Sequence, residues 1–221
     1  MKTAIIIPAY NATSTLNLLL ARLMEFAPKH DIIVIDDGSS DSTAEAAKLS
    51  GVELIIHQHN KGKGAALRSG FELALNKDCE AVITIDADGQ HDPKYIPALV
   101  DTMDTGRWDI VVGSRRNEFD RMSFARYLSN SITTTVVSIL AGTRISDSQS
   151  GYRSIRTSVL KSVKLKTSRY QMESELLIKA ARQGFKIGSV DITNIPGNTS
   201  HISHLKDTLR FLIMAIQTLW I

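Results

Sequence analysis

Short runs of apolar, often β-branched residues alternate along this chain with longer segments in which apolar residues recur every three or four positions. The runs are typical of buried strands, and the recurring pattern is typical of amphipathic helices. Strands are predicted at 3–7, 31–35, 52–56, 81–85 and 109–112, and each is followed by a helical segment. The first helix is expected to bury a stripe made of Leu16, Leu18, Leu19, Leu20, Leu23 and Met24. This alternation predicts an α/β fold with a mostly parallel sheet and helices on both faces.

Composition narrows the class of protein. The 221 residues, 43% of them hydrophobic and 22% charged, suffice for one large α/β domain, and no repeat or linker divides the chain. The formal net charge of +3 suits anionic ligands or a membrane surface and is too small to indicate nucleic acid. A single cysteine, Cys79, excludes an internal disulfide and suits a reducing cytosol. We find neither a signal-peptide pattern nor a run of about 20 apolar residues, so we expect a cytoplasmic protein that is not integral to a membrane.

The strand predicted at 81–85 ends in two acidic residues, Asp86 and Asp88, and Gly89, Gln90 and Pro93 follow closely. Both carboxylates can face one point beyond the strand end, where paired carboxylates offer the oxygen ligands that Mg²⁺ or Mn²⁺ prefers. An Asp-x-Asp pattern after a strand is also ordinary turn chemistry. A polar turn is therefore the alternative to a metal site.

Three further polar clusters follow predicted strands, at 8–11, 36–38 and 113–115. Ligands bind beyond the carboxyl ends of the strands in an open α/β sheet, so all four clusters are expected at one edge. Tyr10 offers a flat ring on which a base can stack, unless the ring packs as a half-buried side chain. The carboxylate of Asp36 or Asp37 can accept a hydrogen bond from a base N–H or a ribose hydroxyl.

Five short motifs stand in a fixed order along the chain: PAYN at 8–11, DDGSSD at 36–41, NKGKGA at 60–65, DADGQH at 86–91 and DSQSGYR at 147–153. Together they resemble the motifs of inverting family 2 glycosyltransferases. Within that family the chain looks closest to the dolichyl-phosphate or polyprenyl-phosphate sugar synthases that use mannose or glucose. Each motif alone is weak, but five in the right order over 8–153 are specific.

The resemblance implies a GT-A fold, in which a Rossmann-like nucleotide-sugar-binding half, residues 1–115, precedes an acceptor-binding half, residues 116–200. It also implies a GDP- or UDP-linked sugar as donor and Mg²⁺ or Mn²⁺ as cofactor. Bound by Asp86 and Asp88, such a cation would stabilise the negative charge of the departing diphosphate, and inversion would follow from a single in-line displacement.

Carried onto this chain, the resemblance assigns one group of residues to the donor and its metal. The base and ribose contacts are Pro8, Tyr10, Asp36 and Asp37, and the metal and diphosphate contacts are Asp86, Asp88 and Gln90. The glycines at 62 and 64 would allow a close approach to the donor, with Lys63 near its diphosphate. The family commonly has an acidic residue where this chain has Ala12, which leaves the base and the sugar open.

The acceptor has two possible chemistries. An acceptor hydroxyl would need a general base, for which Asp147 is the candidate, whereas a lipid phosphate is already anionic and would leave Asp147 to orient a substrate. The resemblance implies phosphate contacts from Arg115 and Arg126, and Arg153 is near enough in sequence to join them; a solvated basic loop is the alternative. Glu173 and Glu175, near the start of a predicted helix, fit either a site or the acids that favour a helix N-terminus.

Residues 201–221 carry apolar side chains at helical spacing together with Lys206 and Arg210, so this amphipathic segment is expected to lie at a membrane interface or to pack on the domain. The leading hypothesis is an inverting, metal-dependent enzyme, peripheral at the cytoplasmic membrane face, that transfers a sugar to a polyprenyl phosphate. One alternative is transfer to a hydroxyl of a saccharide or lipid. The other is a nucleotide-sugar-binding regulatory protein without turnover, which would not need Asp86, Asp88 and Asp147 together.

Overall fold

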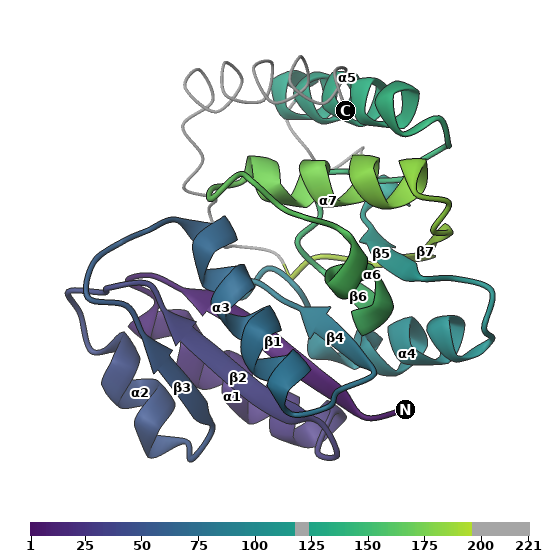
Figure 1. The fold of residues 1–221 in the computed structure, drawn as a ribbon. Helices are drawn as coiled ribbons and strands as arrows, with labels where there is room; N and C mark the ends of the chain where they lie inside the picture. The colour runs from purple at the N-terminus through teal and green to yellow at the C-terminus, as the bar shows by residue number, and fades with distance from the viewer. Residues whose placement is uncertain (118–123, 196–221) are drawn as a thin grey trace.

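A computed structural model describes residues 1–117 and 124–195. These residues build one seven-stranded sheet with the strand order β3-β2-β1-β4-β6-β5-β7, shown in Figure 1. The strands are β1 Thr3–Ala9, β2 Asp31–Asp36, β3 Glu53–Ile56, β4 Ala81–Thr84, β5 Ile110–Ser114, β6 Arg153–Arg156 and β7 Ile187–Asp191. The helices are α1 Thr13–Phe26, α2 Thr43–Leu49, α3 Lys63–Asn76, the short 3₁₀ helix η1 Pro93–Tyr95, α4 Ile96–Asp104, α5 Phe124–Ala141, α6 Thr157–Ser162 and α7 Gln171–Arg182. The prediction of a mostly parallel sheet with helices on both faces is confirmed.

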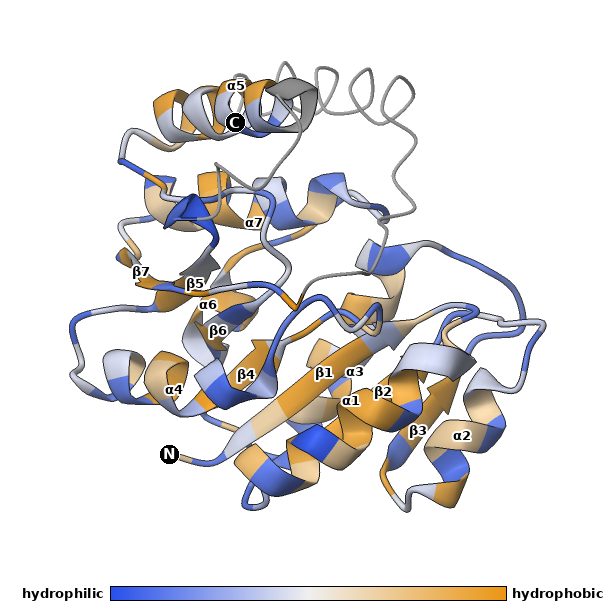
Figure 2. Cartoon of the chain, turned by 180° about the vertical axis from the view of Figure 1, so that it is seen from behind, coloured by the Kyte–Doolittle hydropathy of each residue, from blue (hydrophilic) through white to orange (hydrophobic). Residues whose placement is uncertain are grey.

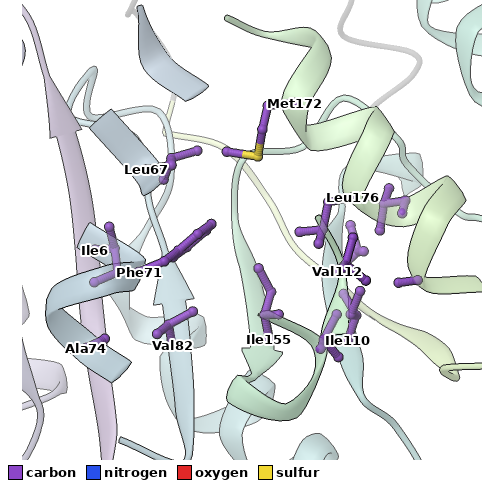
Figure 3. Packing of buried hydrophobic residues seen from close by; sticks show 14 of the residues in the cluster. Ile6, Leu67, Phe71, Ala74, Val82, Ile110, Val112, Ile155, Met172 and Leu176 are labelled. Carbon is purple, nitrogen blue, oxygen red and sulfur yellow. The ribbon is translucent and has the colours of Figure 1, made fainter. Parts of the chain in front are cut away.

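Two apolar layers enclose the sheet. Successive strand residues point to opposite faces, so Ile5 and Ile7 of β1 pack on the side of α1 and α4, while Ile6 packs on the side of α3 and α7. Figure 3 shows the second layer, where Leu67 and Phe71 of α3 lie close to Ile6 and Val82. Figure 2 shows the orange of hydrophobic residues along β1 and β2. The sheet is therefore covered by apolar side chains on both faces.

Helix α1 packs through one face only. Leu16, Leu19, Leu20 and Leu23 are buried at the i, i+3, i+4 and i+7 spacing of a single stripe. The wider stripe predicted from the sequence is wrong at Leu18, which lies on the opposite side of the helix, and at Met24, which lies at the margin of the stripe in the last turn; both are exposed.

The described strands all run parallel to their neighbours except β6, which is antiparallel to both β4 and β5. Arg153, the first residue of β6, pairs with Thr84 at the end of β4 and with Val112 near the end of β5. The loop before β6 is thus delivered to the carboxyl ends of the parallel strands. The Thr84 hydroxyl fixes this loop by donating a hydrogen bond of 2.7 Å to the carbonyl of Gly151.

The segment at 167–169, which precedes α7, packs on the first turn of α3. The backbone N–H of Ala65 donates to the carbonyl of Ser168 at 3.0 Å. A Cβ atom added at Gly62 would lie 2.7 Å from that carbonyl oxygen, and one added at Gly64 would lie 2.8 Å from the carbonyl oxygen of Arg169. The glycines at 62 and 64 therefore allow this segment of backbone to lie against the start of α3.

None of the helices in the described ranges is both long and apolar enough to span a membrane.

Candidate active site

The end of β4 places Asp86 next to a half-buried lysine. The Nζ atom of Lys63, at the start of α3, lies 2.7 Å from Oδ1 of Asp86 and 2.9 Å from its Oδ2. The same ammonium group lies 3.1 Å from Oε1 of Glu173 on α7. Burial alone would raise the pKa of Asp86, but the charge of Lys63 holds that pKa below its ordinary value. Lys63 therefore joins the acidic motif to an acid from the other half of the chain.

Asp88 lies beside this cluster with a different electrostatic environment. Its Oδ1 accepts a 3.0 Å hydrogen bond from the backbone N–H of Gln90, and it forms no ion pair with any described residue. Burial, and then repulsion from Asp86, raise the pKa of Asp88. A pair of close carboxylates in which one lacks a counter-ion is suited to a divalent cation.

The surrounding groups fit such a cation. The side-chain nitrogen of Gln90 is buried and has no hydrogen-bond partner in the described structure. As an N–H donor it suits a phosphate oxygen, whereas only the amide oxygen of Gln90 could bind a cation. No cluster of three or more His, Cys, Asp or Glu side chains able to hold a metal exists within the described ranges. A cation here would thus rely on Asp86, Asp88 and Gln90 and would take its remaining ligands from phosphate oxygens and water, as Mg²⁺ commonly does.

Arg115 and Asp147 are brought together as a buried ion pair. Arg115 follows β5, and its Nε and Nη2 donate to Oδ2 and Oδ1 of Asp147 at 2.8 and 3.0 Å. Oδ1 also accepts from the backbone N–H groups of Gln149 and Ser150, each at 3.0 Å. Burial opposes ionisation of Asp147, but Arg115 holds its pKa below the ordinary value. Both oxygens of Asp147 are therefore already occupied.

The other two predicted phosphate contacts have different outcomes. Arg153 is only 1% exposed, and its three guanidinium nitrogens donate to the carbonyls of Ser150, Glu173 and Ser148 at 2.7, 2.7 and 2.8 Å. A phosphate contact from Arg153 is contradicted by this geometry, because every nitrogen already binds a backbone carbonyl inside the protein. Arg126 belongs to α5, but its side chain is outside the described part of the structure.

The predicted base and ribose residues follow β1 and β2. Pro8 is half-buried in β1, and the ring of Tyr10 just beyond it is 52% exposed, so it is not the packed side chain considered as the alternative. Asp36 is buried, with Oδ1 accepting from the backbone N–H of Ser39 at 3.0 Å. The paired strands place Ala9 opposite Asp36, which brings the exposed ring and this carboxylate to one corner of the edge.

Asp37 is held by a chain of interior contacts. Its Oδ1 lies 2.7 Å from Nδ1 of His57, and Nε2 of His57 lies 3.0 Å from the hydroxyl of Ser69. The backbone N–H groups of Lys61 and Gly62 donate to the same carboxylate at 3.0 and 2.7 Å. Asp37 thus fixes the loop that precedes Lys63, and its carboxylate supports the site through that loop.

From the sequence, Glu173 and Glu175 could each belong to a site or favour a helix N-terminus. The structure gives the two acids different contacts. Glu173 pairs with Lys63 at the site. Glu175 instead accepts from the backbone N–H groups of Lys166 and Thr167 at 2.9 Å and pairs with Lys179 at 2.6 Å. The contact between His57 and Asp37 was not predicted from the sequence. The one available signal was that each residue lies just beyond a predicted strand.

Comparisons with known proteins identify the family and the fold of this chain. Residues 4–164 match the family model described as glycosyl transferase family 2. The undecaprenyl-phosphate mannosyltransferase of Micrococcus luteus is 31% identical over 87% of this chain and 83% of that protein. The UDP-N-acetylglucosamine–dolichyl-phosphate N-acetylglucosaminyltransferase of Methanococcus voltae is 32% identical over 86% of this chain and 84% of that protein.

Among solved structures, glucosyl-3-phosphoglycerate synthase from Mycobacterium tuberculosis in complex with Mg²⁺ and uridine-diphosphate superimposes with a TM-score of 0.75. The match covers 99% of this chain and 78% of that chain at 21% identity, and it confirms the predicted GT-A fold. The family match, the two relatives and the common fold support one conclusion. The chain belongs to glycosyl transferase family 2 and is a glycosyltransferase.

Proposed function

We propose that this glycosyltransferase transfers a sugar from a GDP- or UDP-linked donor to a polyprenyl phosphate, with inversion at the anomeric carbon and with Mg²⁺ or Mn²⁺ as cofactor. The relatives whose names specify undecaprenyl-phosphate or dolichyl-phosphate support this acceptor class. The structural observation that carries the proposal is the saturated hydrogen bonding of Asp147.

Asp147 is poorly placed to act as a general base. Its Oδ2 accepts from the backbone N–H and from Nε of Arg115, and its Oδ1 accepts from Nη2 of Arg115 and from two backbone N–H groups. A base must reach the proton that it removes and must have a pKa near the operating pH. Asp147 has neither property, because its oxygens already accept these hydrogen bonds and Arg115 holds its pKa below the ordinary value in spite of burial. The favoured acceptor is therefore one that is already anionic.

Arg115 supplies the positive charge that such an acceptor needs. Asp147 fixes its guanidinium through two hydrogen bonds and so holds it in one orientation at the edge of the sheet. Arg115 follows β5 and Asp86 follows β4, and β6 pairs with both strands, so the guanidinium lies on the same edge of the sheet as the metal-binding carboxylates. A phosphate held by Arg115 would therefore approach the donor from the side of the second half of the sheet.

The donor half provides binding and charge. The exposed ring of Tyr10 and the carboxylate of Asp36 would contact the base and ribose. Asp86 and Asp88, with Gln90, would hold the cation, which supplies charge stabilisation for the departing diphosphate. Asp37 positions the loop leading to Lys63, whose ammonium group is available to the same phosphates.

Helix α5 supports contact with a membrane surface. Leu128, Ile132 and Ile139 are exposed on it and lie on one face, because they are separated by four and seven residues. Val137 and Ala141 on the opposite face are buried against the domain. A helix with an exposed apolar stripe is suited to a bilayer interface. The amphipathic segment predicted at 201–221 lies outside the described residues.

The direct test is transfer from a panel of labelled GDP- and UDP-sugars with Mn²⁺, with and without a short polyprenyl phosphate. Chloroform-extractable label only in the tubes that contain the lipid is the expected result, and NMR of the product should show inverted anomeric configuration. Product formed without the lipid phosphate, on a saccharide or lipid hydroxyl, would contradict the proposed acceptor. Asp88→Asn serves as the inactive control.

Membrane contact is tested separately by flotation with anionic lipid vesicles. Wild-type protein is expected to float with the vesicles, and Ile132→Glu with Ile139→Glu is expected to reduce the floating fraction. Leu49→Glu is the matched control, since Leu49 is 88% exposed on α2, a helix of the other half. Equal loss of flotation in the control would contradict a specific role for α5.

A further inference from the structure

The ammonium group of Lys63 occupies the position of a cation in the acidic site. It lies within 2.9 Å of both oxygens of Asp86 and within 3.2 Å of both oxygens of Glu173. The side chains of Lys63, Asp86 and Glu173 are 15%, 24% and 10% exposed. Solvent therefore screens this ion pair weakly, and the opposite charges attract one another strongly.

The geometry gives Lys63 no space to share Asp86 with a divalent cation. A Cβ atom added at Gly151 would lie 2.6 Å from Oδ2 of Asp86 and 2.8 Å from Nζ of Lys63, so the pair is enclosed by backbone on that side. A metal ion bound to Asp86 would lie at about 2 Å from a carboxylate oxygen. The metal and the ammonium would then be in direct like-charge contact, and one of them must move.

We propose that Lys63 competes with the divalent cation for Asp86, so that the metal and the nucleotide bind cooperatively. This inference rests on the proposed function, because it concerns the same metal and donor. In the protein without donor, Lys63 neutralises Asp86 and lowers its affinity for the metal. The donor diphosphate gives the ammonium group a new anionic partner, and Asp86 is then released to the metal.

Glu173 acts in this exchange as a positioning residue. It belongs to α7, in the acceptor half, and its second contact fixes the ammonium between the two halves of the chain. Movement of Lys63 toward a diphosphate breaks this contact. Donor binding is thereby transmitted to α7, the helix whose Glu173 carbonyl accepts a hydrogen bond of 2.7 Å from the buried Arg153.

The test measures Mn²⁺ binding by the electron paramagnetic resonance signal of free Mn²⁺, without nucleotide and with saturating UDP or GDP. Each signal is compared with that of a protein-free sample at the same nucleotide concentration, because UDP and GDP also bind Mn²⁺. For wild-type protein, the nucleotide is expected to tighten Mn²⁺ binding by at least about tenfold. Removing a like-charge repulsion from a weakly screened site changes the binding free energy by more than a tenfold affinity requires. Lys63→Met is expected to bind Mn²⁺ about tenfold more tightly than wild type without nucleotide, and to gain less from the nucleotide. If Lys63→Met fails to fold, Lys63→Gln removes the same charge with a polar side chain and gives the same comparison.

Two further variants separate charge from packing. Lys63→Arg keeps the positive charge and should bind Mn²⁺ alone as weakly as wild type. Lys77→Met removes an ion pair of 2.7 Å with Glu53 just beyond the other end of α3, and should leave Mn²⁺ binding unchanged. Wild-type protein that binds Mn²⁺ alone as tightly as Lys63→Met would overturn the inference and leave the proposed function intact. Failure of every variant to bind Mn²⁺ with either nucleotide would overturn both.

Discussion

The guanidinium of Arg115 and the carboxylate of Asp147 form a two-point ion pair, with Nε to Oδ2 at 2.8 Å and Nη2 to Oδ1 at 3.0 Å. Arg115 follows β5 and Asp147 precedes β6, so the antiparallel pairing of these strands creates the contact. The acid that sequence reasoning considered as a base is thus the group that orients the predicted phosphate-binding arginine.

Asp147→Asn should therefore act on acceptor binding. The amide keeps the shape of the carboxylate but loses its charge, so Arg115 becomes less firmly held and the KM for polyprenyl phosphate should rise by about tenfold with a smaller change in kcat. Steady-state kinetics over a range of pH provide the measurement. A general base would behave differently: its loss would lower kcat by about 10²- to 10⁴-fold and remove the acidic limb of the pH profile. Asp101→Asn, on the exposed face of α4, is the control.

Asp88→Ala should abolish sugar transfer while leaving the fold intact. Burial and repulsion from Asp86 raise the pKa of Asp88 in the wild-type protein, which means that its charged form is destabilised there. Removal of the carboxylate removes this unfavourable electrostatic energy. Tm measured by calorimetry without metal is expected to be equal to or above the wild-type value, with transfer reduced by at least about 10²-fold. Turnover at the wild-type rate would exclude Asp88 from the metal site.

Glu175→Gln tests a purely structural acid. The buried carboxylate binds Lys179 and the backbone at 166–167, so its loss should lower the free energy of unfolding at neutral pH by about 3 kcal/mol. Chemical denaturation gives this quantity. Glu45→Gln, exposed in the first turn of α2, should change it by less than about 1 kcal/mol.

The same variant should change the dependence of stability on pH. Burial would raise the pKa of Glu175, but Lys179 and Thr167 hold it below the ordinary value of 4.5. A lowered pKa in the folded state means that the unfolded chain binds the proton first, so the contribution of Glu175 is complete above pH 4.5 and is lost as the pH falls through the folded-state pKa. The decline in stability below pH 4.5 should therefore be shallower in Glu175→Gln than in wild type. Parallel curves would contradict this account.

Gly151→Ala and Gly64→Ala should separate function from stability. The added methyl at 151 meets the mobile ends of Asp86 and Lys63, at 2.6 and 2.8 Å, so the site should be displaced with little change in Tm and the KM for the donor should rise by about tenfold or more. At 64 the methyl meets backbone atoms of Ser168 and Arg169 at 2.8 Å, which cannot move so easily. Gly64→Ala should therefore lower the stability by about 1–3 kcal/mol. The reverse pattern would show that the roles of the two glycines have been exchanged.

The sequence predicted the parts of the fold that depend on local pattern. The apolar runs at β1, β2 and β4 identify buried strands, and the polar residues just beyond them identify the ligand edge. Strand β6 was not predicted because Arg153–Arg156 contains one apolar residue, Ile155, and lacks the alternation of a recognisable strand. Arg153 donates to the carbonyls of Ser148 and Ser150 in the preceding loop and of Glu173 on α7, and no hydrophobic pattern encodes these contacts.

The motifs predicted which residues gather at the edge, but their pairings had to come from the fold. Lys63 and Glu173 lie 110 positions apart, and their contact depends on how the segment at 167–169 packs on α3. Asp36 and Asp37 are adjacent aspartates, so the sequence alone does not distinguish their roles. Only the strand geometry sends Asp37 toward His57 and places Asp36 at the corner with Tyr10.

The position of β6 between β4 and β5 has a consequence for synthesis. A nascent chain that has passed residue 115 already contains every parallel strand from β1 to β5, yet the strand that joins β4 to β5 is still untranslated. Until residue 156 leaves the ribosome, β4 offers an unpaired edge built from the apolar sequence Ala81–Thr84. We therefore expect the nascent chain to be vulnerable to aggregation from the time β4 leaves the ribosome until β6 has followed it.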